Sequence, residues 1–110
     1  MIIKTTYIQN LQTLIIIEQD NQPIGSIKSV VDVREDTHGE LTTGRIVIDR
    51  ETVNKDLFST PGNFNISVYK YVDNSLENIQ KFNDCVLYSH TIPVEVDNYI
   101  ILEESRILYV

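Results

Sequence analysis

The sequence contains no alanine and no tryptophan, and it has one cysteine, three prolines and four glycines among its 110 residues. Alanine is the strongest helix former, whereas the β-branched residues favour strands, so 16 Ile, 11 Val and 9 Thr without an alanine nearly exclude a helical bundle. The single cysteine, Cys85, cannot form an internal disulfide and offers no metal-site spacing. The core must therefore be held by packing, or be completed by a partner.

Long apolar runs and positive charge are also scarce. The longest purely apolar run is Leu14 to Ile17, far below the roughly 20 residues of a membrane span. The N-terminus lacks the apolar region of a secretory signal, so we expect a chain made in the cytosol that has no membrane partner. Sixteen Asp and Glu against nine Lys and Arg give a formal net charge of −7, which disfavours binding to nucleic-acid phosphates.

Alternation of apolar and polar residues with a period of two runs through much of the chain and predicts strands. The clearest example is 63–72, where Phe64, Ile66 and Val68 fall on one face of a half-buried strand. Further strands are predicted at 7–9, 14–18, 26–33, 44–49, 85–90, 94–96 and 106–110. Turn residues separate them at 19–25, 38–39, 60–62 and 73–75.

Two connections carry apolar residues at helical spacing behind a candidate N-cap, at 50–58 and 75–82. A length of 110 residues allows one domain, residues 1–110. The sequence therefore predicts an all-β fold with one or two short helices, built as an antiparallel β-barrel or β-sandwich.

No residue cluster has the spacing of an active site or a metal site. Cys85 lies in an apolar strand and is expected to be a small buried hydrophobe rather than a reactive thiol. His38 is expected to be a solvated turn residue, and the same interpretation applies to His90 at a strand end. The acidic pairs 35–36 and 103–104 are too sparse for metal binding. We therefore expect no enzymatic activity, no cofactor and no metal.

Residues 34–44 combine charges, hydroxyls and glycine between two predicted strands, which predicts a projecting loop. An ordinary solvent-exposed connection explains the segment, and so does an intermolecular contact, because mixed charges and hydroxyls suit a polar interface. The second interpretation gives these candidate inter-subunit contact residues: Arg34, Glu35, Asp36, Thr37, His38, Glu40, Thr42 and Thr43. Assembly is also favoured because five lysines and three prolines offer little protection for the edge strands of a small sheet.

The order of these segments resembles the tail-tube family of contractile-tailed bacteriophages, whose relatives include the haemolysin-coregulated tube protein of type VI secretion. The family's order begins with an early strand, a polar connection and a second strand, which correspond to 23–33, 34–44 and 45–50. A short helical link at 53–58 and an alternating strand at 64–69 come next in that order. The C-terminal part resembles the family in three further segments. These are a cysteine-bearing strand at 82–89, the acidic segment Val94-Glu-Val-Asp-Asn-Tyr-Ile-Ile-Leu-Glu103, and a closing strand at 106–110. The resemblance covers residues 20–110.

This resemblance implies a non-enzymatic virion subunit, made in the host cytoplasm, that forms hexameric rings which stack into a tail tube. DNA would pass through the tube without specific binding, since carboxylates facing the lumen repel its phosphates. A tube initiator, a baseplate protein or another virion protein on the same barrel is also compatible, with other tail or baseplate proteins as partners. The residues themselves leave a further alternative, a monomeric β-sandwich that binds a protein or a carbohydrate through 34–44.

Overall fold

The computed structural model describes residues 3–28, 30–35, 39–49, 64–89, 91 and 93–109, and every regular element in these ranges is a β-strand. The strands are β1 (Ile3–Ile8), β2 (Thr13–Gln19), β3 (Gln22–Ile27), β4 (Val30–Glu35), β5 (Gly39–Thr43), β6 (Ile46–Asp49), β7 (Phe64–Val72), β8 (Ser75–Ser89), β9 (Val94–Val96), β10 (Tyr99–Leu102) and β11 (Arg106–Tyr109). The predicted all-β class is confirmed.

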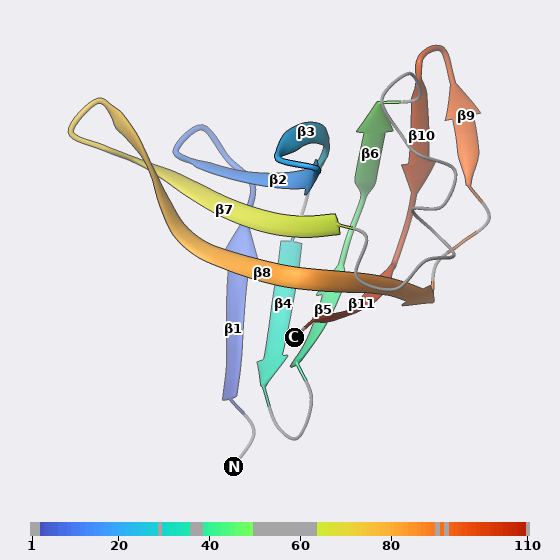
Figure 1. The fold of residues 1–110 in the computed structure, drawn as a ribbon, viewed down its shortest axis with the longest axis horizontal. Coiled ribbons are helices and arrows are strands. Elements are labelled where there is room, and N and C mark those ends of the chain that lie inside the picture. Colours follow the sequence, from blue (N-terminus) through green and yellow to red (C-terminus); the bar gives the residue numbers. More distant parts are fainter. Residues whose placement is uncertain are drawn as a thin grey trace.

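The eleven strands form one sheet in the order β1-β4-β5-β11-β8-β7-β2-β3-β6-β10-β9 (Figure 1). Every neighbouring pair is antiparallel. Among the described strands, β1 and β9 each pair with one neighbour only, so these two strands are the edges and the sheet is not closed into a barrel. Of the two predicted architectures, the sandwich therefore describes the fold.

Three chain segments pass from one half of the sheet to the other at a common corner. β3 ends at Ile27 and β4 begins at Val30, β6 follows β5 after residues 44–45, and β11 follows β10 after residues 103–105. The strands β4, β5 and β11 are neighbours in one half, and β3, β6 and β10 are neighbours in the other. Strands that bend and change sheets in this way make the corners of packed β-sandwiches. The sheet therefore folds over on itself.

Hydrogen bonds between backbone groups hold this corner. The Lys28 N–H donates to the Arg45 carbonyl at 2.8 Å, and the Thr43 N–H donates to the Ser105 carbonyl at 2.9 Å. The Arg45 Nε also donates to Glu103 Oε1 at 2.6 Å, but both side chains are more than two-fifths exposed. Exposed ion pairs contribute little to stability, so the backbone hydrogen bonds stabilise this corner more than the ion pair does.

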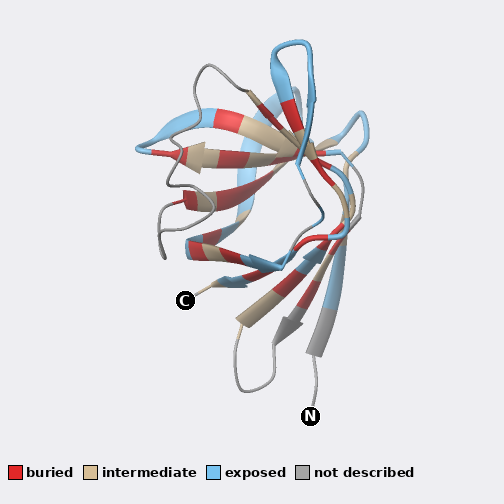
Figure 2. Cartoon of the chain, turned by 90° about the vertical axis from the view of Figure 1, so that its right-hand side faces the viewer, coloured by how far each residue is buried: buried red, intermediate tan, exposed pale blue. Residues whose placement is uncertain are grey.

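One hydrophobic core fills the space between the two halves. It includes Ile15 and Ile66 from one half and Val31, Leu41 and Ile107 from the other, all with no exposed surface. Figure 2 shows buried residues alternating with less buried ones along strands of both halves. The Phe82 ring links strands from both sides, with ring centroids 6.3 Å from Tyr7 and 4.8 Å from Tyr109. The edge-to-face geometry of both contacts suits aromatic packing.

The short helix predicted at 75–82 is wrong, because this segment is the start of the long strand β8. Asp73 and Asn74 have φ of 50° and 66°, which is the backbone of a two-residue hairpin turn, and β7 pairs with β8 from Val72 onward. The pairing shifts by one residue between Tyr69 and Val68, which leaves Ile79 as the extra residue of a β-bulge. The bulge interrupts the period of two, and this produces the helix-like spacing. The other predicted helix, 50–58, lies outside the described residues.

Other strand boundaries also differ from the prediction. The single strand expected at 26–33 is divided by the corner into β3 and β4. The short strand β10 was missed, because its four residues follow directly after a turn in which Asp97 has a φ of 53°. β3 begins at Gln22, inside the segment 19–25 that was predicted as a turn, because two residues, Asp20 and Asn21, suffice to reverse the chain.

The close approach of β3 and β6 at Gly25 gives a testable prediction. A Cβ atom at this position would lie 2.4 Å from the carbonyl oxygen of Val47 and 2.9 Å from the Cα of Ile48. We expect Gly25→Ala to lower the free energy of unfolding by about 1–3 kcal/mol, because the two strands must separate to make room. Urea denaturation followed by circular dichroism measures this, with Ser26→Ala as the control. An unfolding midpoint equal to that of the control would contradict the close approach.

Candidate interaction surfaces

The segment predicted as a projecting contact loop, 34–44, is mostly paired strand. Arg34 and Glu35 end β4, and the candidates Glu40, Thr42 and Thr43 lie in β5, between β4 and β11. The loop prediction is wrong because the polar residues of β5 hide a period of two, in which Leu41 and Thr43 are buried. The remaining candidates, Asp36, Thr37 and His38, lie outside the described residues.

The three candidate residues on β5 do not all lie on the same face of the strand. Thr43 faces inward and is 3% exposed, and its hydroxyl and N–H both contact the Ser105 carbonyl, at 3.4 Å and 2.9 Å. It therefore supports the corner and is not placed to meet a partner. Thr42 is exposed and Glu40 is half-buried, and both lie on the outward face.

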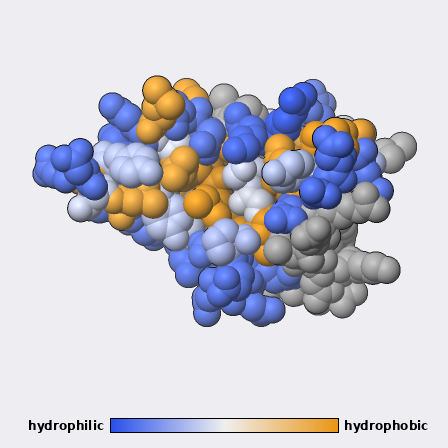
Figure 3. All heavy atoms as spheres, turned by 90° about the horizontal axis from the view of Figure 1, so that it is seen from above, coloured by the Kyte–Doolittle hydropathy of each residue, from blue (hydrophilic) through white to orange (hydrophobic). Residues whose placement is uncertain are grey.

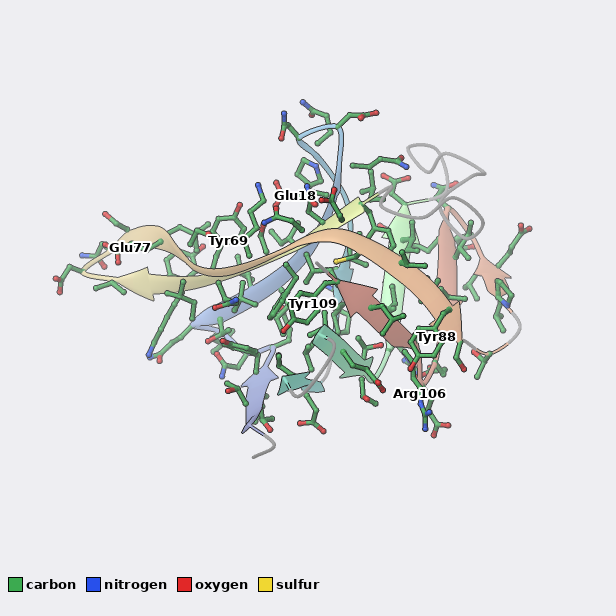
Figure 4. All side chains as sticks on the ribbon, turned by 60° about the horizontal axis from the view of Figure 1, so that its bottom comes forward. Glu18, Tyr69, Glu77, Tyr88, Arg106 and Tyr109 are labelled. Carbon is green, nitrogen blue, oxygen red and sulfur yellow. The ribbon has the colours of Figure 1, made fainter. Side chains whose placement is uncertain are left out.

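Glu40 belongs to a polar cluster that the sequence did not reveal. Its carboxylate accepts a hydrogen bond from the Tyr88 hydroxyl, which also contacts the Arg106 side chain. Figure 4 shows Tyr88 and Arg106 side by side at the end of β8. Partial desolvation, followed by the Glu40 carboxylate, raises the pKa of Tyr88, and Arg106 opposes that shift. The three residues are far apart in the chain and meet only because β5, β11 and β8 are neighbours in the sheet.

The Cys85 thiol is buried in the core, as predicted. It has no exposed surface, and its Sγ donates to the Phe82 carbonyl at 3.4 Å. Burial raises its pKa to about 12, a hydrogen bond to the Ile66 backbone lowers the pKa, and the charge of Asp84 raises it. A thiol with this pKa carries almost no thiolate at neutral pH, which is the form that reacts.

Metal ligands do not gather in the part of the chain that the structure describes, where no three His, Cys, Asp or Glu side chains form a group. Both histidines, His38 and His90, lie outside those residues. The same described residues contain no helix that is long and apolar enough to cross a membrane.

A second surface is formed by the outward face of β2, β3, β6 and β10. The register aligns Ile16, Ser26, Val47 and Ile101 in one row across these four strands. The three apolar members of the row are only half-buried. Antiparallel strands with one solvated face normally alternate apolar and polar residues, so apolar side chains on both faces are unusual.

An open hollow of about 510 Å³ lies on this outward face, which we call the outer hollow. Its walls are mostly apolar, and Lys28 and Asp49 are its charged members. The lining residues are Ile16, Pro23, Ile24, Gly25, Ser26, Lys28, Val47, Asp49 and Tyr99.

The β7–β8 hairpin projects beyond the core as an arm, which we define as residues 70–79, all of them exposed. At its base Lys70 still pairs with Thr13 of β2, and the Tyr71 N–H donates to the Gln12 carbonyl at 2.9 Å. Its large apolar side chains are between 37% and 47% exposed: Tyr71, Val72, Leu76 and Ile79. Figure 1 shows the arm extending away from the other strands, and Figure 3 shows apolar side chains from its base toward the middle of that side of the molecule.

No protein-family model matches this chain, and no curated protein and no solved structure matches it either. The resemblance to phage tail-tube proteins therefore stays a prediction, and the proposals below depend on the surfaces described above.

The cluster of Glu40, Tyr88 and Arg106 predicts a change in tyrosine titration. Replacing Glu40 with Gln removes the negative charge that disfavours the phenolate, so the pKa of Tyr88 should fall toward its ordinary value. Arg106→Gln should shift it in the opposite direction. Titration of ¹³Cζ-labelled tyrosine by NMR measures both shifts, with Tyr88→Phe used to assign the signal. An unchanged titration in Glu40→Gln would contradict the cluster.

Proposed function

We propose that this chain is a non-enzymatic structural subunit that assembles with copies of itself. More specifically, we propose a bacteriophage tail-tube subunit whose rings, hexameric as the resemblance implies, stack into a conduit for DNA in the virion tail. The observation that carries the proposal is a sheet that has two open edges among the described residues, with apolar side chains on its outward face as well as in its core.

The open edges support assembly. Each of β1 and β9 pairs with one described strand only, and the three residues of β9 are all exposed. An edge strand presents backbone groups that another chain can pair with. In an antiparallel sheet of eleven strands, the two edge strands run in the same direction. Joining the β9 edge of one copy to the β1 edge of the next in a ring would therefore make a parallel pair. Such a contact is head-to-tail and closes into a ring when its rotation allows.

The charge of the chain agrees with a conduit for DNA. A formal net charge of −7 gives a surface that repels phosphates over about one Debye length, roughly 8–10 Å at physiological salt. DNA would then slide through the ring without being held. Other tail or baseplate proteins would be the further partners, and a tube-initiator or baseplate ring on the same fold would use the same edges.

Self-association tests this proposal. Size-exclusion chromatography with light scattering, from low micromolar to millimolar concentration, should show a concentration-dependent increase in mass. Negative-stain images of the concentrated protein, alone and with a crowding agent that favours nucleation, should show rings or stacked rings. A monomer under all of these conditions would contradict the proposal and favour the alternative of a monomeric β-sandwich that binds a protein or a carbohydrate.

A further inference from the structure

We propose that the outward face of β2, β3, β6 and β10 packs against the same face of a second copy of this chain, in a two-fold symmetric contact. This contact lies outside the proposed ring, because it uses a face of the sheet and not the pairing of the edge strands β1 and β9. The face contact and the ring can therefore be tested separately.

The centre of this face is a row of uncharged side chains. Its members, one from each of the four strands, are Ile16, Ser26, Val47 and Ile101. The register continues the row to Val94 of β9, which is 56% exposed. Five strands at about 4.8 Å spacing give the row a length of roughly 20 Å. An apolar row of this length, with no covering layer among the described residues, marks a contact with another molecule.

Two opposite charges flank the row at equal distances. Lys28 follows Ser26 by two residues, and Asp49 follows Val47 by two residues. Because Ser26 and Val47 are partners in the antiparallel pair of β3 and β6, the two charged residues lie on opposite sides of the row. Each is roughly 7 Å from the row along its strand. Both line the outer hollow, so both belong to the same face as the apolar row.

This arrangement is self-complementary under a two-fold rotation about the row. The rotation turns the face over and exchanges its two sides, so the apolar row of one copy meets the row of the other. The Lys28 side of each copy then meets the Asp49 side of its partner, which gives two equivalent ion pairs. A two-fold axis along the strands would instead bring like charges together, so the charges select the axis along the row.

Arg45 does not compete strongly for this role. It lies on the same side of the row as Lys28, but its Nε already donates to Glu103 Oε1 of its own chain at 2.6 Å. Lys28 is therefore the cation of β3 and β6 that faces Asp49 of the second copy.

The net charge of the chain favours a second copy at this face. At −7, two copies repel one another over most of their surfaces and can approach most closely where the contact is neutral. The apolar row carries no charge, and the charges of Lys28 and Asp49 cancel. The face therefore combines apolar surface with local neutrality, which is what contact between two acidic copies requires.

The outer hollow is the space that the second sheet occupies. Packed sheets lie about 10 Å apart, and the side chains of their facing surfaces interdigitate. The hollow is open and has a volume of about 510 Å³, which leaves room over Ser26 and Gly25 for side chains from the opposite sheet. The contact thus covers the apolar walls of the hollow in both copies at once.

Charge reversal, in single variants and in their mixture, tests this contact. In a symmetric dimer, Lys28→Glu and Asp49→Lys each create two pairs of like charges, so we expect each variant alone to have a dimer dissociation constant at least ~10-fold above that of the wild-type chain. In an equimolar mixture, one variant has two acidic groups at these positions and the other has two lysines. Both pairs are then attractive, and a mixed dimer should form with near wild-type affinity.

Analytical ultracentrifugation with one variant fluorescently labelled measures the mixed dimer, after circular dichroism has shown that each variant is folded. Lys70→Glu and Glu77→Lys are the matched controls, because they make the same changes of charge at exposed positions of the arm. We expect each control to dimerise as the wild-type chain does.

A mixture that dimerises no better than its two components would overturn the two-fold contact, and so would single variants that dimerise like the wild-type chain. If wild-type rings still appear in negative-stain images in that case, only the face contact fails and the proposed function stands. If the mixture restores the dimer but no rings form under any condition, the face contact stands and the proposed rings fail.

Discussion

Backbone hydrogen bonds across one corner determine the shape of this protein. Three neighbouring segments bend at the same place, and the bonds from Lys28 to Arg45 and from Thr43 to Ser105 continue the strand pairing through the bend. Because the sheet folds over there, residues such as Val31 and Ile15, which belong to different halves, enter one core. With no alanine and no disulfide available, this folded-over sheet is how a chain of 110 residues buries its many β-branched side chains.

The corner also determines which surfaces remain available. Folding the sheet buries the inward side chains of most strands, but it leaves β1 and β9 as edges and leaves the outward face of β2, β3, β6 and β10 without a covering layer among the described residues. β8 is longer than either β7 or β11. It pairs with β11 at one end and forms the arm with β7 at the other. The arm and the outer hollow therefore both stay on the surface of the described structure.

Much of the fold could be predicted from local sequence pattern. The rest could not be predicted, and the reasons are physical. The β-branched composition and the alternation at Phe64, Ile66 and Val68 predicted an all-β fold, because period-two burial needs no long-range information. A corner and a bulge depend on long-range information. The predicted strand 26–33 is divided into β3 and β4 where three segments change halves of the sheet together, and the bulge at Ile79 imitates helical spacing. The candidate site was predictable only in part. Glu40 and Thr42 reach the surface, whereas Tyr88 and Arg106 join Glu40 through strand order, which residue types alone do not contain.

Hydrogen–deuterium exchange at increasing protein concentration tests the central claim, that copies of this chain assemble through the edge strands β1 and β9. Amides of β1 and β9 should exchange markedly more slowly as concentration rises, because strand pairing between copies would hydrogen-bond them. Amides of the central strand β11 should be unaffected, since both of its neighbours are already present in one chain. Exchange of the β1 and β9 amides that is the same at every concentration, in a sample that light scattering shows to be assembled, would contradict the account.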